Sequence, residues 1–246
     1  MFSRFLVVSL ISVVFPAVAL AGPPFRTDDP EPVEYEHWEF YVASQGSFSQ
    51  DDSVMTAPHV EVNYGVLPNV QIHLLAPFEY VDPKGEASHY GYSDTELGVK
   101  FRFIQETDWR PQAGVFPIVL LPTGDEDKNL GTGKVQAFFP LWLQKSWEPW
   151  KTYGGGGYWI NPGSGNRDYW FFGWEVEREM SEFLTLGAEI FHQTASERGG
   201  DSDTGFNVGA IVNFSEMHHL LLSAGRDISG PNDFSYYIGY QLTFGP

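Results

Sequence analysis

Carboxylate and imidazole side chains recur at every second residue in several segments of this 246-residue chain. His59 and Glu61 alternate with apolar residues in PHVEVNY, and His73 and Glu79 do the same in VQIHLLAPFEY. Such alternation places these side chains on one face of a strand. Imidazoles and carboxylates can bind zinc, but they also suit the polar lining of a barrel. We predict a polar lining and no metal site.

The same alternation assigns further charged side chains to that face. Lys100 and Arg102 alternate with large apolar residues in DTELGVKFRF. The predicted lumen-lining residues are His59, Glu61, His73, Glu79, Glu96, Lys100, Arg102, Glu175, Glu177 and Glu189. Buried carboxylates without partners are costly, so this face is expected to contact water or to pair with cations. Arg26, Asp28 and Asp29, which precede the first strand, are candidates for a plug that pairs with it.

Other motifs suggest chemistry that their context does not support. YGGGGYW (153–159) lacks the helix and the Lys-Ser/Thr of a phosphate loop, so its glycines are expected to permit a bend or to leave lumen space. PTGDED (122–127) lacks a calcium-loop pattern and is expected to be an external loop. His192 and Ser196 suggest a lipid-modifying enzyme, but no orienting third group is identifiable. We therefore predict no catalytic residues and no cofactor.

Period-two alternation recurs along the chain, whereas helical periodicity is nearly absent. This pattern predicts an all-β protein of about twelve strands. The expected strands are 37–45, 58–64, 70–80, 94–103, 112–122, 135–145, 152–161, 168–178, 184–193, 206–214, 219–226 and 234–244. Each is near the roughly 9–11 residues that a tilted strand needs to cross a bilayer.

The connections between these strands are expected to alternate between short and long. The short set is 65–69, 105–110, 146–149, 178–183 and 215–218, and the long set is 46–56, 81–90, 123–134, 161–168, 194–204 and 227–233. Short periplasmic turns and long external loops are typical of transmembrane, antiparallel, up-and-down β-barrels. A lipocalin-like soluble barrel is the alternative, but eight strands suffice for it.

Tryptophans are expected at both membrane interfaces of such a barrel. Trp109, Trp147 and Trp150 fall at the short turns, and Trp159 and Trp170 fall near the long loops. The outer faces of the strands should then contact the lipid bilayer.

The N-terminus resembles a secretory signal peptide. One Arg4 precedes an apolar stretch that closes on Ala19-Leu20-Ala21, which predicts a signal peptide over 1–21, cut after Ala21. A membrane anchor is the alternative, weakened by Pro16. Residues 22–36 are expected to form a periplasmic N-terminal segment or plug, and 37–246 the barrel. We therefore predict export to a Gram-negative outer membrane, with help from the barrel-assembly machinery.

Composition limits the partners. The net charge of −18 repels phosphate backbones, so no nucleic acid is expected. No run of 18 apolar residues follows the signal, so no transmembrane helix is expected. Aromatic residues make up 16% of the chain, which argues against disorder. Without cysteine, the chain can be neither a lipoprotein nor disulfide-bonded.

Four stretches carry a family resemblance: GPPFRTDDPEPVEYEHWEFY, GYSDTELGVKFRF, FPIVLLPTGDE with the following GTG, and YGGGGYWINPG. They resemble the transporters grouped as the "MetA pathway of phenol degradation" family, over essentially the whole chain after the signal. The resemblance implies an outer-membrane β-barrel connected with aromatic-compound catabolism. The chain departs from barrels of this kind in one respect, because Gly245 and Pro246 follow Phe244.

These observations predict a channel for the passive passage of small organic molecules. Inward carboxylates outnumber Lys100 and Arg102, which favours uncharged or cationic solutes. Inward Tyr153, Trp159 and Tyr237 would add aromatic faces along the path, and the resemblance suggests aromatic solutes. A lipid-modifying enzyme of the lipase or acyltransferase type and a structural barrel without a pore are the alternatives.

Overall fold

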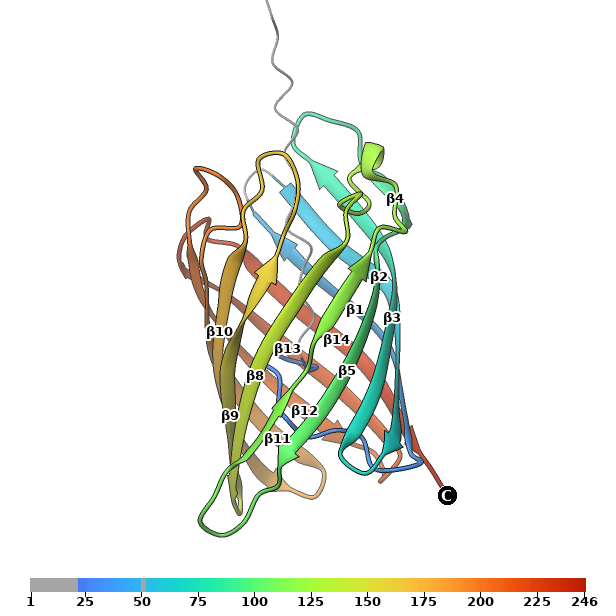
Figure 1. The fold of residues 1–246 in the computed structure, drawn as a ribbon, viewed down its shortest axis with the longest axis vertical. Coiled ribbons are helices and arrows are strands. Elements are labelled where there is room, and N and C mark those ends of the chain that lie inside the picture. The colour runs from blue at the N-terminus through green and yellow to red at the C-terminus, as the bar shows by residue number, and fades with distance from the viewer. Residues whose placement is uncertain (1–21, 50–51) are drawn as a thin grey trace, which may run out of the picture.

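The computed structural model describes residues 22–49 and 52–246, so the predicted signal peptide lies outside the described residues. Within these residues, fourteen strands form one antiparallel sheet, which closes where β1 pairs with β14 from Trp38 opposite Phe244 to Phe48 opposite Phe234 (Figure 1). The strands are β1 (Trp38–Phe48), β2 (Asp52–Leu67), β3 (Val70–Pro83), β4 (His89–Tyr92), β5 (Thr95–Ile104), β6 (Gln112–Val115), β7 (Ile118–Leu121), β8 (Gln136–Trp147), β9 (Trp150–Ile160), β10 (Tyr169–Ser181), β11 (Leu184–Gln193), β12 (Asp203–Asn213), β13 (His218–Ser229) and β14 (Phe234–Phe244).

The fourteen strands make twelve crossings of the barrel wall, because two crossings are interrupted. β4 and β5 are separated at Ser93 and Asp94, and β6 and β7 are separated at Phe116 and Pro117. Pro117 has no N–H to give to a neighbouring strand, which accounts for the second break. The predicted closed antiparallel barrel of about twelve strands is confirmed.

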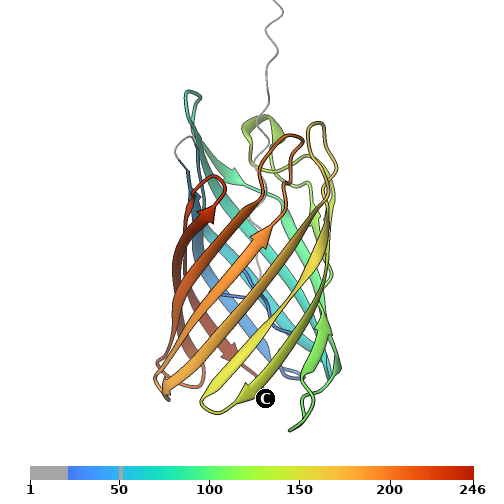
Figure 2. The ribbon, with the colours of Figure 1, turned by 90° about the vertical axis from the view of Figure 1, so that its left-hand side faces the viewer.

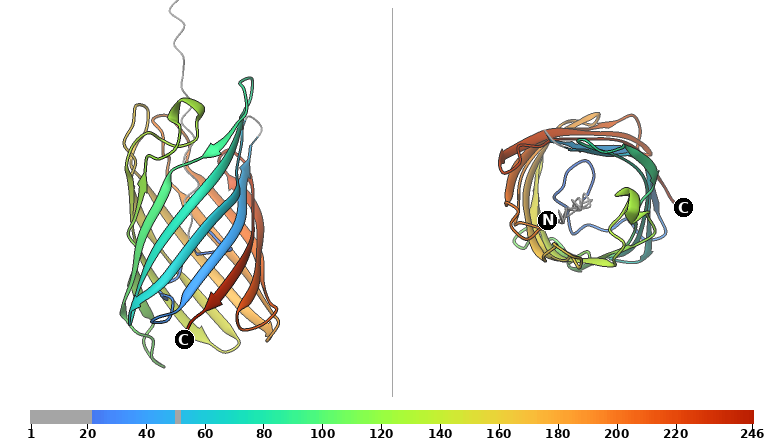
Figure 3. Two further views of the ribbon diagram at one scale, coloured as in Figure 1. Left: turned by 90° about the vertical axis from the view of Figure 1, so that its right-hand side faces the viewer. Right: turned by 90° about the horizontal axis from the view of Figure 1, so that it is seen from above.

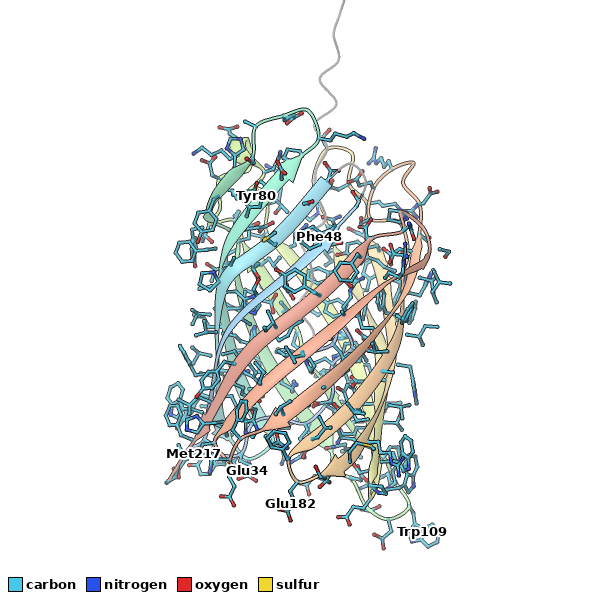
Figure 4. The ribbon with its side chains drawn as sticks, turned by 180° about the vertical axis from the view of Figure 1, so that it is seen from behind. Glu34, Phe48, Tyr80, Trp109, Glu182 and Met217 are labelled. Atoms are coloured by element: carbon cyan, nitrogen blue, oxygen red, sulfur yellow. The ribbon has the colours of Figure 1, made fainter. Side chains whose placement is uncertain are left out.

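All strands are tilted in the same sense around the barrel (Figure 2). Trp109, Glu182 and Met217 mark the rim that carries the short turns, and Phe48 and Tyr80 lie toward the opposite, long-loop rim (Figure 4). The C-terminus lies at the short-turn rim (Figure 3, left). Since β14 is paired on both sides, its aromatic edge is not open to another chain.

Side chains alternate between the two faces of the wall. In β8, Phe138 and Trp142 are buried inside the barrel, whereas Phe139, Leu141 and Leu143 are exposed on its outer surface. The same outer row continues around the barrel through Ile72, Leu74, Leu97, Val99, Trp174, Val176, Ile190, Val208 and Ile238. Soluble monomers rarely expose so continuous an apolar surface, and a lipid bilayer would cover it.

Two sequence predictions about the rims are wrong. The connection at 46–56 is not a long loop, because β1 continues to Phe48 and β2 begins at Asp52. Trp159 does not lie in an outer girdle: it faces inward, is 1% exposed and stacks on Phe138 with ring centroids 4.7 Å apart. Trp109, by contrast, is 95% exposed at the short-turn rim (Figure 4).

The rest of the described chain adds little regular structure. One short 3-10 helix, η1 (Glu126–Lys128), lies in the loop after β7. None of the helices in the described residues has the length and apolar character needed to cross a membrane. The four-glycine run 154–157 lies within β9, as expected for a barrel strand and not for a phosphate loop.

Candidate functional site

The segment 22–36 lies inside the barrel (Figure 3, right). Phe25, Thr27, Asp28 and Pro30 are buried there, each less than a tenth exposed. The segment leaves the lumen at the short-turn rim, where Glu34 lies (Figure 4), and Tyr35 forms an isolated bridge with Gly65 of β2. The interior of the barrel therefore contains a second structural layer that does not belong to the sheet.

Glu189 of β11 is the main anchor of this segment. Its Oε1 accepts the backbone N–H of Arg26 at 2.8 Å, and its Oε2 accepts the N–H of Thr27 at 2.8 Å and the Thr27 hydroxyl at 2.6 Å. Asn207 of β12 donates to Oε1 at 2.6 Å. Hydrogen bonds to a charged acceptor contribute about 1.5–3 kcal/mol each, so this carboxylate holds the segment firmly.

Glycines in the wall make room for the segment. A β-carbon at Gly173 would overlap the Thr27 hydroxyl, and β-carbons at Gly187 and Gly209 would lie 2.7 Å from the Phe25 ring. Side chains essentially never approach so closely, so the three glycines let Phe25 and Thr27 lie directly against β10, β11 and β12. The fit indicates that wall and segment form one packed unit.

Arg26 extends from the segment to a group of inward aromatic side chains. We call this group the aromatic cluster: Phe138, Trp142, Trp159, Tyr169, Phe171 and Phe191. The Arg26 guanidinium carbon lies 4.2 Å from the Phe191 ring centroid and 5.4 Å from that of Phe171. The Arg26 Nη2 group donates a hydrogen bond to Gln193 Oε1 at 3.2 Å. A cation over an aromatic face is attracted by the ring quadrupole, so Arg26 ties the segment to the cluster.

Two wall cations bind the acidic part of the segment. Lys100 Nζ lies 2.9 Å from Asp28 Oδ1 and 3.6 Å from Asp29 Oδ1. Arg102 Nη1 lies 3.4 Å from Glu31 Oε1. Burial raises the pKa of the Asp28 carboxyl to about 6, although the Lys100 ammonium acts to lower it. Lys100 and Arg102 thus form their ion pairs with the segment.

A cavity of about 440 Å³ lies between the segment and the wall. Asp28, Asp29 and Glu31 line it from the segment. From the wall it is lined by charged and polar side chains that include Glu39, Glu61, His73, Lys100, Lys151 and Glu177, and by Tyr41, Phe116, Tyr153, Ile211 and Leu221. We call it the lumen cavity.

Charges on the wall of the lumen cavity are arranged in pairs. His73 Nε2 lies 3.0 Å from Glu96 Oε1, and its Nδ1 lies 3.5 Å from Glu61 Oε1. Lys151 Nζ lies 2.8 Å from Glu177 Oε2. Opposite charges at these distances offset much of the cost of removing each one from water.

The ten side chains named from the sequence all point into the barrel, but they do not form one site. Glu61, His73, Lys100 and Glu177 line the lumen cavity. Glu96 lies behind His73, which lines the cavity. Arg102 hydrogen-bonds to Asn69, Gln112 and Glu31 nearer the short-turn rim. The remaining four lie apart from the cavity: His59, Glu79, Glu175 and Glu189.

The four residues apart from the cavity have different surroundings. His59 Nδ1 lies 2.7 Å from Thr56 Oγ1. Glu79 lies near the long-loop end of β3, opposite Thr56 and Gly91. Glu175 is fully buried, and neither of its oxygens has a hydrogen-bond partner among the described residues. Glu189 holds the segment, as described above. Of the three plug candidates, Arg26 binds aromatic rings, and Asp28 and Asp29 bind Lys100.

Neither a metal site nor a catalytic arrangement is seen in the described residues. They contain no group of three or more His, Asp or Glu side chains placed to hold a metal ion. His192 Nδ1 lies 2.8 Å from the Thr204 hydroxyl on the next strand. In the part of the chain that the structure describes, no hydrogen bond joins His192 to Ser196 or to a carboxylate.

Sequence reasoning missed several residues of this site. Thr27 and Phe25 gave no signal, because a segment too polar and proline-rich to form a strand has no periodicity to interpret. Gly173 and Gly187 could have been noticed as glycines inside strand patterns, which indicate close approach of another chain segment. Lys151 was overlooked, although alternation from Tyr153 places it on the inner face.

Comparisons with known proteins bear on the fold. No protein-family model and no curated protein matches the chain. An outer membrane channel from Pseudomonas putida F1 has a TM-score of 0.72 at 17% identity, with 88% of this chain and 98% of that chain covered. The KdgM porin, solved with disordered oligogalacturonate, has a TM-score of 0.56 at 7% identity and coverage of 83% and 99%.

A third similar structure belongs to a protein of a different kind. The translocator domain of the autotransporter NalP from Neisseria meningitidis has a TM-score of 0.55 at 11% identity, covering 84% of this chain and 88% of that chain. At these identities the comparisons establish the shared barrel fold. Because channels, porins and a translocator domain all share it, the function has to be inferred from the lumen.

Proposed function

We propose that this chain is an outer-membrane channel through which small organic molecules pass passively, with the segment 22–36 narrowing its lumen. The observation that carries the proposal is the lumen cavity, a polar space enclosed between a closed barrel wall and a segment anchored within it. A barrel of twelve crossings is wider than the side-chain-filled barrels of eight strands and narrower than porins of sixteen or more. Such a lumen suits small solutes.

The outer surface supports the membrane location. Its apolar row continues around the barrel, and exposed tryptophans lie at the short-turn rim, as expected for a bilayer with aromatic interfaces. In this orientation the short-turn rim faces the periplasm and the long loops face outward. Export by the predicted signal peptide and insertion by the barrel-assembly machinery belong to the same proposal.

The solute class is inferred from the lining of the cavity. Its carboxylates outnumber its lysines, which disfavours anions. Tyr41, Phe116 and Tyr153 contribute aromatic faces. Together with the resemblance to the "MetA pathway of phenol degradation" transporters, this supports small uncharged or cationic molecules, aromatic ones among them.

Liposome swelling tests this function. The full chain is reconstituted in liposomes, which are challenged with neutral, cationic and anionic monoaromatic solutes and with a large oligosaccharide. We expect swelling with the neutral and cationic monoaromatics, slower swelling with the anion, and none with the oligosaccharide. Absence of flux for every solute would refute the channel.

A further inference from the structure

The basic groups around the lumen cavity already have acidic partners. Lys100 is bound by Asp28 and Asp29, and Lys151 is bound by Glu177. Even with these pairs complete, the cavity retains carboxylates without a cation. Among the described residues that line the cavity, a permeating anion would therefore meet no basic side chain that lacks a carboxylate partner.

Glu39 is the clearest of the carboxylates without a cation. It lies on β1 between Asn63 of β2 and Thr243 of β14, all three of which line the cavity. No ion pair to Glu39 occurs among the described residues. Its Oε2 accepts the Tyr41 hydroxyl at 2.8 Å. A carboxylate can accept about four hydrogen bonds, so most of its capacity is unused.

A relay of hydrogen bonds holds this carboxylate in place. The Gln241 amide on β14 donates to the Tyr41 hydroxyl at 2.9 Å, and that hydroxyl donates to Glu39. The three side chains come from two paired strands, so the sheet fixes their relative positions. A second acceptor is free in the same cavity: Asp28 is 1% exposed, and its Oδ2 has no hydrogen-bond partner in the described chain.

Beside this polar site, part of the cavity wall is apolar. Tyr41 and Leu221 are buried members of one hydrophobic cluster, and Ile211 packs against it. All three line the lumen cavity. Its volume of about 440 Å³ lies within the roughly 300–1,000 Å³ typical of small-molecule pockets. A bare metal ion would leave this apolar surface uncovered, whereas an organic cation would place its charge at Glu39 and its apolar part against this surface.

We propose that the lumen cavity binds a small organic ammonium ion, whose charged group is received by Glu39 and whose apolar body lies against Tyr41, Ile211 and Leu221. This rests on the proposed channel function and specifies which solutes stay longest in its lumen. An ammonium group brings three donors to a site rich in acceptors. The cavity thus selects for positive charge and a small apolar body together.

Calorimetry on the folded full chain in detergent tests the site without requiring conduction. The probe is 2-phenylethylammonium, compared with neutral 2-phenylethanol and anionic phenylacetate, which share its ring. Loss of a hydrogen bond to a charged group weakens binding about tenfold or more. We therefore expect the ammonium to bind about tenfold more tightly than either comparator, and Glu39→Gln to abolish that preference.

Glu182→Gln is the matched control, because it makes the same charge change at the short-turn rim (Figure 4), at a residue that does not line the lumen cavity. Glu182 is exposed and outside the relay, so its replacement should alter binding less than about twofold. Tyr41→Phe, which keeps the ring and removes the hydroxyl, should weaken binding by about threefold to tenfold. It also provides a second test should Glu39→Gln fold poorly.

The outcomes separate the site from the channel. Equal affinity for the three probes, or unchanged ammonium binding in both Glu39→Gln and Tyr41→Phe, would overturn the proposed site even if solutes still permeate liposomes. Selective ammonium binding without any solute flux would support the site and contradict the proposed channel.

Discussion

The two halves of the barrel interior differ in chemistry. Toward the long-loop rim, the side chains of the aromatic cluster, from β8 to β11, pack against one another. Trp159 stacks on Phe138, and Phe171 stacks on Phe191 with ring centroids 6.4 Å apart. Toward the short-turn rim, the lumen cavity is lined by charged pairs and retains open volume. The segment 22–36 contacts both. The contrast suggests that packing in the cluster stabilises the barrel, while in the proposed channel the charges of the cavity would select the solutes that pass.

The largest effect is expected in the aromatic cluster. Trp142 is 1% exposed, and Trp142→Ala should lower the free energy of unfolding by about 3–5 kcal/mol, as for other buried tryptophans. Urea unfolding monitored by gel mobility measures this. Phe139→Ala, on the outer face of β8, should cost less because lipid fills the space. Equal losses would show that the cluster does not contribute to stability in this way.

The outer and inner faces of the barrel wall should differ in their tolerance of a change in charge. Val62→Arg places a charge on the outer row of β2, and should destabilise the barrel in bilayers by up to about 2–4 kcal/mol, the cost of a cation at the bilayer midplane. Glu61→Gln on the inner row keeps the shape of the side chain and should cost far less. Folding yield into lipid vesicles at graded urea compares them. Similar sensitivity at the two neighbours would contradict the assigned faces.

Glu189 lies where the two halves meet, and its loss should affect the segment more than the barrel. Glu189→Ala removes the acceptor of three hydrogen bonds from Arg26 and Thr27, about 1.5–3 kcal/mol each in isolation. We expect the segment to become accessible to protease while the barrel remains folded. Glu182→Gln, at the exposed short-turn rim (Figure 4), is the control. A protected segment in Glu189→Ala would indicate that other contacts suffice.

The smallest effect is expected at Arg26. Arg26→Lys keeps the charge but loses the planar group over Phe191 and Phe171, which should weaken docking of the segment by about 0.5–2 kcal/mol. Protease accessibility of the segment reports this change against wild type. A larger effect than that of Glu189→Ala would mean that the aromatic half, and not Glu189, holds the segment.

The sequence predicted the wall of this molecule better than its interior. Strict alternation with a known period defined the strands and assigned Glu61, His73 and Lys100 to the inner face. The segment 22–36 has no such period, and its contacts join residues more than 160 positions apart, such as Thr27 and Glu189. For Trp159, proximity to a strand end suggested a girdle, but the alternation that also placed it on the inner face with Tyr153 determines its burial.

The pairing of charges inside the barrel could not be predicted from the sequence. Inward charges could be counted from the sequence, but which cation meets which carboxylate depends on strand register and on the path of the segment. Lys100 therefore pairs with Asp28, whereas Glu39 pairs with no cation in the described chain. Packing and register in three dimensions decide such pairings.

In the proposed channel, the segment 22–36 narrows a conducting lumen. Single-channel conductance in planar bilayers measures this narrowing, by comparing the full chain with a variant lacking residues 22–33. We expect a small conductance for the full chain and a several-fold larger one for the variant, because removing the segment joins the lumen cavity to the rest of the lumen. Equal conductance in two correctly folded proteins, or none in the variant, would contradict it.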